Sequence, residues 1–201
     1  RKVLKVAQQK GWMEHGKFLE ELGELCVKEE TYPSFLDWDE LRTVMETDMP
    51  AGRLERVKDV FVFCALTGLS YQGISTLCPS HLFRDDEGTL WICRTRAEGA
   101  EVGDSCTSRV PLLKPAMVLL EKYRGWNLMN PEGPCFPVPS VQKMNEYLKE
   151  VAARCRISKR LTTQMARNTF AATVTLASRI PKEHVREMLG YSSDYMLRHY
   201  M

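Results

Sequence analysis

The sequence contains no apolar run long enough to cross a lipid bilayer. Residues 1–20 alternate charged and apolar positions and lack an uninterrupted hydrophobic stretch, which is not the pattern of a secretory signal. Apolar residues make up 44% and charged residues 27% of the 201 positions, ordinary values for a globular protein. We therefore expect a soluble, cytoplasmic protein without a membrane partner, in which a domain buries its own core.

The sequence also lacks the residue patterns that are typical of metal and cofactor sites. The seven cysteines include no C-x-x-C pair and the four histidines stand apart from them, which argues against a zinc site and a disulfide framework. The chain has no P-loop and no carboxylate cluster spaced for paired metals. We expect no cofactor and no metal, and we interpret the cysteines as small core residues.

An excess of one charge is missing as well. The 28 basic and 26 acidic residues leave a net charge of only +2 at pH 7. This balance permits a nucleic-acid partner but does not indicate one by itself.

Helical periodicity dominates what is present. Asp37 and Glu40 form a capping-box pattern, so a helix is expected to begin near Trp38. Ser70 can cap the start of another helix. Further helices are expected over 54–66, 115–126, 140–155 and 163–177, with a short one between Pro181 and Gly190.

Strand patterns occur only in the middle of the chain. Residues 89–94 and 109–112 are rich in apolar and β-branched side chains, and the polar, glycine-containing stretch 98–104 lies between them. The predicted fold class is therefore mainly α with a small β-hairpin or sheet, an α+β arrangement.

Two residues near the carboxyl end suggest chemistry on a phosphodiester. Arg167 and Tyr200 lie 33 residues apart in sequence. A guanidinium binds phosphate oxygens with two parallel hydrogen bonds and stays charged at every relevant pH. A tyrosine hydroxyl, once activated, can attack phosphorus and keep the bond energy in a phosphotyrosine ester, which requires neither nucleotide nor metal.

The surrounding residues resemble the tyrosine recombinases of the phage-integrase type. Residues 161–171 read L-T-T-Q-M-A-R-N-T-F-A and are similar to the family's L-T-x-H-x-x-R-H-T-F-A box. Residues 189–193 read L-G-Y-S-S and resemble its L-G-H-x-S, with Tyr200 at the nucleophile's spacing, and residues 63–71 resemble the first box. The resemblance covers about residues 36–201. The amino-acid sequence of these boxes is most similar to that of integrases of Bacteroides-type mobile elements, whose first box also reads T-G-L-S-Y.

The resemblance implies a catalytic site that departs from the usual pattern. Arg167 matches the second arginine and Tyr200 the nucleophile. Ser70 stands where most members have their first arginine, so Arg96 on the hairpin, or Arg94 beside it, is the candidate for a second guanidinium.

The residues at the family's proton-transfer positions also differ from the usual ones. Gln164 replaces the box histidine and can donate a hydrogen bond but cannot exchange a proton near neutral pH. Tyr191 replaces a later histidine or tryptophan, and Glu98 falls near the expected hairpin lysine. His184 and His199 lie near the motif and are candidates to replace the lost imidazole, with exposed helical histidines as the more ordinary interpretation.

The resemblance also implies an organisation. Residues 1–36 would be the terminal helix and linker of a missing core-binding domain, and residues 37–201 the catalytic domain. Its partner would be duplex DNA at an attachment or recombination site, in a bacterial cytoplasm. The protein would act as a homo-tetramer in the synaptic complex, whereas this chain, as a fragment, would be monomeric. The expected activity is site-specific recombination, or integration, by strand cleavage and rejoining through a covalent 3′-phosphotyrosine.

Three alternatives stay open at this stage. A recombinase relative weakened by Gln164 and Glu98 could act as a DNA-binding or regulatory module. A type IB topoisomerase shares the phosphotyrosine chemistry but relaxes supercoils as a monomer. An unrelated helical domain with an accidental match would not bring Arg167 and Tyr200 to one pocket.

Overall fold

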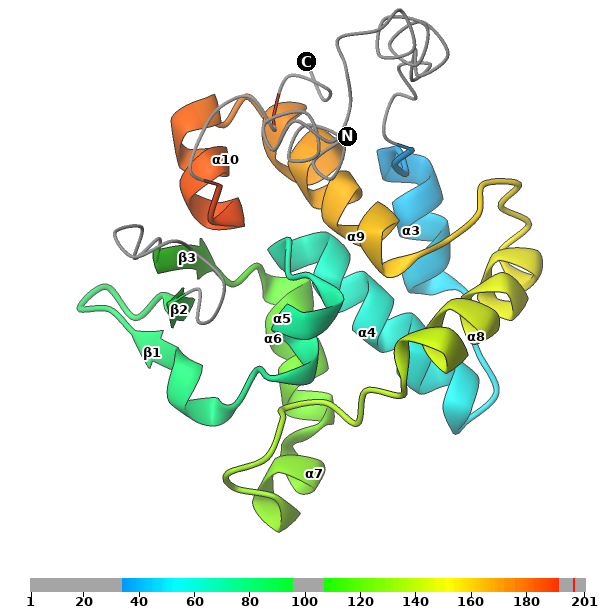
Figure 1. Ribbon diagram of the computed structural model, residues 1–201, viewed down its shortest axis with the longest axis horizontal. Coiled ribbons are helices and arrows are strands. Elements are labelled where there is room, and N and C mark those ends of the chain that lie inside the picture. Colours follow the sequence, from blue (N-terminus) through cyan, green and yellow to red (C-terminus); the bar gives the residue numbers. More distant parts are fainter. Residues whose placement is uncertain (1–33, 96–106, 192–196, 198–201) are drawn as a thin grey trace, which may run out of the picture. The chain divides into compact units, whose positions relative to one another are not determined.

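The computed structural model describes residues 34–95, 107–191 and 197. Backbone contacts divide the chain into Arg1–Tyr32 and Pro33–Met201, and the description below concerns the second unit. Its described part consists of helices and one small antiparallel sheet (Figure 1), which confirms the predicted fold class. None of the described helices has the length and apolar character that a membrane span requires.

The first described helix begins where the sequence predicts, and the second ends where it predicts. Helix α3 spans Trp38–Glu46, and its capping box is complete because Asp37 accepts from the Glu40 backbone while Glu40 accepts from the Asp37 backbone. Helix α4 spans Arg53–Thr67 and ends at Gly68, which adopts the left-handed conformation at φ 71°.

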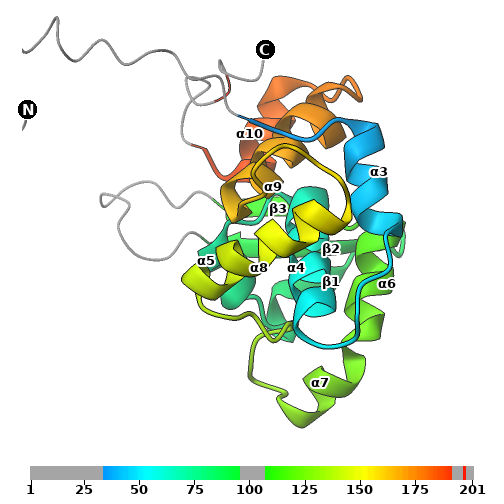
Figure 2. The same cartoon turned by 90° about the vertical axis from the view of Figure 1, so that its right-hand side faces the viewer.

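Helix α4 is the centre of the core. Most of its residues are buried, because helices pack around it on several sides. Figures 1 and 2 show it among its neighbours. These neighbours are α3, α6 (Lys114–Lys122), α8 (Val141–Arg154), α9 (Thr163–Thr169) and η2 (Phe170–Leu176).

The run α9–η2 confirms the helix expected over 163–177, with a change of hydrogen bonding inside it. η2 is π-helical, so Ala177 donates to the carbonyl of Ala172, five residues earlier. The helix expected over 115–126 is instead divided into α6 and α7 (Arg124–Met129). They meet at Tyr123, which is buried and donates its hydroxyl hydrogen to Asp59 on α4 at 2.9 Å.

The sheet has three antiparallel strands in the order β1-β2-β3. β2 (Leu90–Thr95) pairs with β3 (Thr107–Pro111), as expected for the hairpin. β1 (Leu82–Arg84) was not predicted, because three residues are too short for a strand pattern to be recognised. It is joined to β2 by a turn in which the Asp85 carboxylate accepts from the Thr89 backbone and the Trp91 indole.

Three further short helical segments lie in the described part of the unit. α5 (Tyr71–Ser75) begins at Ser70, whose hydroxyl accepts from the Gly73 backbone as predicted. η1 (Pro79–His81) leads into the sheet. α10 (Lys182–Leu189) follows Pro181, ends at the left-handed Gly190 and packs against β3 and η2.

Candidate active site

Arg167 is the residue at which three parts of the fold meet. Its guanidinium donates to the carbonyl of Gly68 at 2.5 Å and to the carbonyl of Leu189 at 2.6 Å. Its Nε lies 3.4 Å from the hydroxyl of Tyr191, and its Cζ lies 4.9 Å from the centre of that ring. The ends of α4 and α10 are thereby tied to the middle of the α9–η2 run.

These contacts hold the guanidinium still without using all of its donors. An arginine carries five N–H groups, and three of them serve the two carbonyls and the tyrosine hydroxyl, which leaves two. Both remaining groups are on the terminal nitrogens, where two parallel hydrogen bonds to an oxyanion are possible. The side chain is half-buried, so an anion reaching it would be partly shielded from water.

Two glycines allow the segments to approach Arg167. Gly68 has φ 71°, and a Cβ built there would lie 2.5 Å from Cδ1 of Phe170 and 2.9 Å from Cδ2 of Leu189. Gly190 has φ 64° and ends α10 in the left-handed conformation. The chain therefore turns back after α10 and lays the Tyr191 ring against Arg167.

The sheet supports the site from the other side of α10. The hydroxyl of Ser108 on β3 donates to the carbonyl of Met188 at 2.5 Å. Met188 immediately precedes Leu189, whose carbonyl accepts from Arg167. The position of the α10 end is therefore fixed by β3 as well as by the arginine.

Cys64 lies beneath the site and behaves as a core residue. It is fully buried, and burial raises the pKa of its thiol to about 12, against the opposing influence of the Arg167 charge. A thiol with this pKa is inert near neutral pH. The interpretation of Cys64 as a small core residue agrees with its burial.

Gln164 lies one turn before Arg167 on the same helix. Its side-chain amide donates to Oδ1 of Asn168 at 3.0 Å, and the residue as a whole is exposed. The structure therefore brings Arg167 and Tyr191 into contact and places Gln164 one turn away. Sequence reasoning assigned no role to Asn168, whose importance becomes visible only through its hydrogen bonds.

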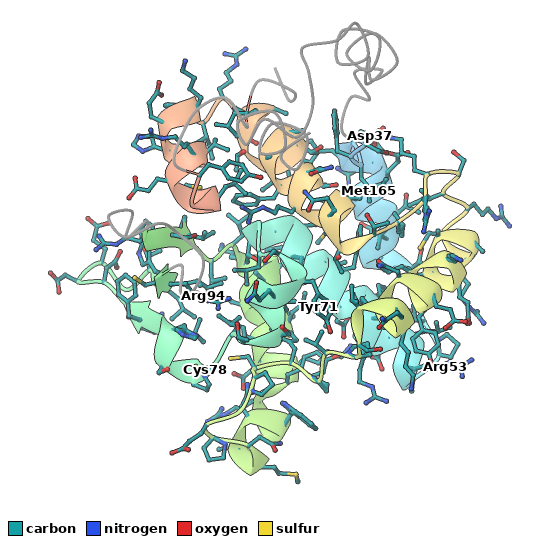
Figure 3. All side chains as sticks on the ribbon, in the orientation of Figure 1. Asp37, Arg53, Tyr71, Cys78, Arg94 and Met165 are labelled. Carbon is teal, nitrogen blue, oxygen red and sulfur yellow. The ribbon has the colours of Figure 1, made fainter. Side chains whose placement is uncertain are left out.

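Arg94 is engaged with α5 in this structure. Figure 3 labels Arg94. One of its terminal nitrogens donates to the carbonyl of Gly73 and the other to Oγ1 of Thr76 at 2.6 Å. Burial lowers the pKa of Arg94. Service as a second guanidinium for a phosphate would require Arg94 to give up contacts that hold the short helix capped by Ser70.

Four sequence-predicted residues lie outside the described residues. They are Tyr200, Arg96, Glu98 and His199. Their roles stay predictions. His184 is described, and it is exposed near the start of α10, which agrees with the interpretation as an ordinary helical histidine.

The described residues offer no evident metal site. Over the ranges 34–95 and 107–191, no three histidine, cysteine or acidic side chains gather closely enough to hold an ion. What the described residues of the candidate site do supply is a set of fixed hydrogen-bond donors around a guanidinium.

Comparison of sequences found no match, neither to a protein-family model nor to a curated protein. Comparison of folds did find similar solved structures. XerH site-specific recombinase bound to a palindromic difH substrate has a TM-score of 0.69 and 17% identity over 87% of this chain and 52% of that chain. XerA recombinase has a TM-score of 0.64 and 19% identity over 86% of this chain and 60% of that chain. The chain thus spans about half to three fifths of the length of these recombinases.

Two integrases are similar as well. The Tn1549 transposon integrase in complex with a circular intermediate DNA has a TM-score of 0.69 and 13% identity, over 98% of this chain and 70% of that chain. The catalytic domain of bacteriophage HP1 integrase has a TM-score of 0.56 and 19% identity, over 83% of this chain and 86% of that chain. Identities this low show likeness of fold and not of activity. The described part of this chain has the fold of the tyrosine recombinase catalytic domain.

Proposed function

We propose that this chain is the catalytic part of a site-specific DNA recombinase of the integrase type. The observation that carries the proposal is the geometry of Arg167, a half-buried guanidinium fixed by two carbonyls with two donors to spare. The residues around it, Gly68 and Leu189–Tyr191, come from the very segments that resemble the family's boxes. The further likeness to integrases of Bacteroides-type mobile elements rests on the similarity of short sequence motifs alone.

The proposed reaction is a transesterification at a DNA phosphodiester. Arg167 binds two non-bridging oxygens of the phosphate and neutralises the charge that increases in the transition state. The Tyr200 oxygen loses its proton and bonds to phosphorus, while the bond from phosphorus to the 5′ oxygen breaks and that oxygen gains a proton. The product is a 3′-phosphotyrosine, and attack by another 5′ hydroxyl reverses the step and rejoins the strand.

Two neighbouring side chains would assist this reaction without transferring protons. Tyr191 orients Arg167 through its ring and its hydroxyl. Gln164 retains one amide hydrogen beyond the one given to Asn168 and can donate it to a phosphate oxygen. General acid–base help is typically worth about 10²–10⁴-fold. We therefore expect slow cleavage, unless Arg96 or another residue of the hairpin contributes.

The partners follow from the same proposal. The substrate would be duplex DNA carrying an attachment or recombination site. The active assembly would be a homo-tetramer that brings two duplexes together. This chain alone would be monomeric. The activity would occur in a bacterial cytoplasm, on behalf of a mobile element.

A covalent-trapping experiment tests the proposal. The full chain is mixed with a pool of nicked duplexes whose sequence is randomised around the nick, so that cleavage releases a short fragment and leaves the protein trapped on DNA. We expect a protein–DNA adduct that survives detergent, is absent in Tyr200→Phe and falls by about 10²–10³-fold in Arg167→Ala. An adduct of undiminished yield in Tyr200→Phe would contradict the assignment of the nucleophile.

The main rival is a recombinase relative that only binds DNA. Gln164 favours it, because an amide cannot replace an imidazole in proton transfer, and so does Ser70, which serves as a helix cap where an arginine is usual. In the same pool, retained binding by mobility shift without any adduct from the unaltered chain would select this rival.

A further inference from the structure

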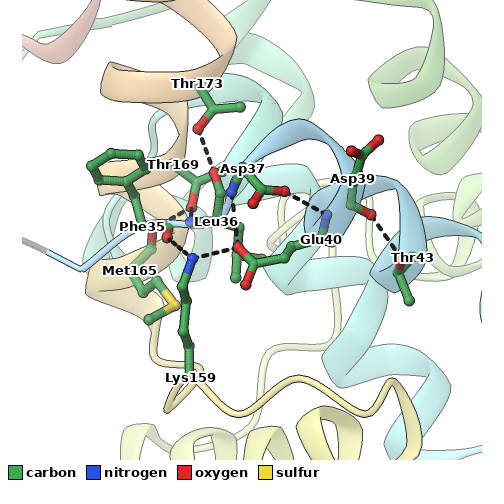
Figure 4. Close-up of polar contacts among 10 residues, drawn as sticks. All are labelled: Phe35, Leu36, Asp37, Asp39, Glu40, Thr43, Lys159, Met165, Thr169 and Thr173. Carbon is green, nitrogen blue, oxygen red and sulfur yellow. Dashed lines mark hydrogen bonds and ion pairs between the residues drawn. The ribbon is translucent and has the colours of Figure 1, made fainter.

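A short stretch of extended chain before α3 is bound along the helix that carries Arg167. We call Ser34–Leu36 the lead-in segment. The amide of Asn168 donates to the carbonyl of Ser34 at 3.1 Å, and the Leu36 backbone N–H donates to Oγ1 of Thr169 at 3.0 Å. The hydroxyl of Thr173 donates to the carbonyl of Leu36 (Figure 4). Three side chains on one helical run thus hold one backbone segment.

Burial makes these hydrogen bonds necessary. Asn168, Thr169 and Thr173 are only 6%, 0% and 4% exposed, although each carries polar atoms. Thr169 also donates to the carbonyl of Met165 at 2.8 Å, so its hydroxyl is satisfied as donor and as acceptor. Buried polar groups without partners cost free energy, so this face of the helix is built to receive the lead-in segment.

A lysine secures the segment from its open side. Nζ of Lys159 lies 3.1 Å from the carbonyl of Phe35 and 2.5 Å from a carboxylate oxygen of Glu40, and Figure 4 shows both contacts. The same Glu40 oxygen accepts from the backbone of Asp37 at 2.9 Å. The lead-in segment is therefore clamped between α9–η2 and the start of α3.

Asn168 has a second contact, which points toward the candidate site. Its Oδ1 accepts from the side-chain amide of Gln164 at 3.0 Å, while its Nδ2 donates to Ser34. One amide plane thus serves two partners, and its orientation is set by both. Because Gln164 is exposed, this bond restricts a side chain that water would otherwise leave free to rotate.

We propose that Asn168 is a positioning residue through which the lead-in segment sets the orientation of Gln164 for the phosphate. This inference rests on the proposed function. When the segment is bound, Asn168 holds one amide hydrogen of Gln164 and leaves the other for a phosphate oxygen. When the segment is displaced, Asn168 loses its partner at Ser34 and Gln164 loses its fixed orientation. The conformation of the chain just before α3 thereby regulates cleavage.

The test separates the contact of Asn168 with Ser34 from its contact with Gln164. Asn168→Asp keeps an oxygen that can accept from Gln164 but removes the donor to Ser34. We expect it to slow formation of the covalent adduct about tenfold, the rate equivalent of one ordinary hydrogen bond. Because the new carboxylate also adds a negative charge near the proposed phosphate site, the effect is compared with that of the same change in a Gln164→Ala background. In that background only the added charge acts, so we expect Asn168→Asp to slow the adduct clearly less than it does when Gln164 is present.

Two further variants guard against a merely structural effect. Thr175→Val removes an equally buried hydroxyl on the same run, one that donates only to Ala171, and should leave the adduct rate unchanged. Lys159→Met loosens the clamp from a partly buried position, so it keeps the test available if Asn168→Asp fails to fold. We expect it to slow the adduct in the Gln164 protein and not in Gln164→Ala.

The outcomes are distinguishable. No adduct from the unaltered chain would overturn the proposed function and, with it, this inference. An adduct from the unaltered chain, together with unchanged rates in Asn168→Asp and Lys159→Met, would overturn the inference alone. If these two variants slow the adduct equally with Gln164 and with Gln164→Ala, the inference is also overturned, because the effect would then not depend on the Gln164 amide.

Discussion

Arg167 gives two of its N–H groups to the carbonyls of Gly68 and Leu189 before any phosphate is present. A carbonyl accepts these hydrogens without neutralising the charge, whereas a carboxylate would form an ion pair and compete with an incoming anion. Carbonyl partners therefore fix the guanidinium and leave its full charge available. Because its partners are carbonyls, Arg167 can stabilise the fold and still bind a phosphate.

Gly68 offers a direct test of how closely the site is packed. Gly68→Ala should destabilise the fold by about 2–4 kcal/mol, because it combines the strain of a positive φ with overlap onto Phe170. Chemical denaturation of the purified chain measures the change.

Gly88→Ala is the matched control for this prediction. Gly88 also has positive φ, at 82°, but a Cβ there meets nothing within 4 Å. It should cost about 1 kcal/mol from backbone strain alone. Equal losses at the two positions would show that the approach of Phe170 to Gly68 carries no energetic weight.

The sequence indicated candidate side chains for the site but not the groups that hold them. Arg167, Gln164 and Tyr191 came from resemblance to the family's boxes, and the structure joins Arg167 to Tyr191 across 24 residues. The carbonyls that hold Arg167 have no side-chain signature, so no pattern could reveal them. For Arg94, the sequence suggested a phosphate contact, whereas its hydrogen bonds to Gly73 and Thr76 depend on how β2 packs against α5.

At the scale of elements, an ion-pair network joins α4 to α6. Lys122 lies 2.6 Å from Asp59 and 2.6 Å from Glu55, and Tyr123 donates to Asp59 as well. The hydrogen bond from Lys122 lowers the pKa of Glu55 below its ordinary value. Burial opposes the charge of Lys122, yet its hydrogen bonds to Asp59 and Glu55 outweigh burial and raise its pKa.

These shifts predict how stability depends on pH. Since the pKa of Glu55 is lower in the folded state, its contribution is present above about pH 4.5 and is lost as the pH falls through the folded value. Glu55→Gln should therefore cost about 0.5 kcal/mol near pH 7, as expected for a partly exposed pair, and progressively less in acid. Urea unfolding at a series of pH values measures this difference.

A second surface carboxylate provides the control for this prediction. Glu121 pairs with Arg124 at 3.1 Å, with both side chains about 70% exposed. Glu121→Gln should change stability by less than about 0.3 kcal/mol at every pH. A difference between Glu55→Gln and the unaltered chain that grows toward acid would contradict the predicted sign.

Elements with strong local signals were the ones the sequence could predict. The Asp37 capping box and the glycines that end α4 and α10 are short-range features, and the structure confirms them. The division between α6 and α7 is different, because it follows from the buried contact of Tyr123 with Asp59, 64 residues away in sequence. Tertiary contacts of this kind leave no local pattern.

At the scale of the whole chain, helical and strand patterns predicted the fold class, whereas the particular fold was predicted through resemblance and not through composition. A net charge of +2 and a helical pattern would suit many unrelated domains. The likeness to recombinase structures shows that the described residues adopt the fold that the motifs predicted. It does not separate recombination from the chemistry of a type IB topoisomerase. Relaxation of a supercoiled plasmid without a specific site would favour the topoisomerase.

The assembly of the site from separate parts of the molecule can be tested at its most distant support. Ser108 on β3 is not itself proposed to contact DNA, and its hydroxyl donates to the carbonyl of Met188 at the end of α10. Ser108→Ala should slow adduct formation by about tenfold while costing only about 1 kcal/mol of stability. Hydrogen exchange at residues 188–190 should increase in parallel, because these residues lose their anchor to the sheet.

Ser75→Ala is the matched control, because the Ser75 hydroxyl donates at 3.1 Å to Gln72 within its own segment and joins no two elements. It should leave both the adduct rate and exchange at 188–190 unchanged. If Ser108→Ala behaves in the same way, the sheet does not position the end of α10. In that case Arg167 holds the ends of α4 and α10 together without help from the sheet, and the loss of either of its carbonyl contacts becomes the change to which the site is most sensitive.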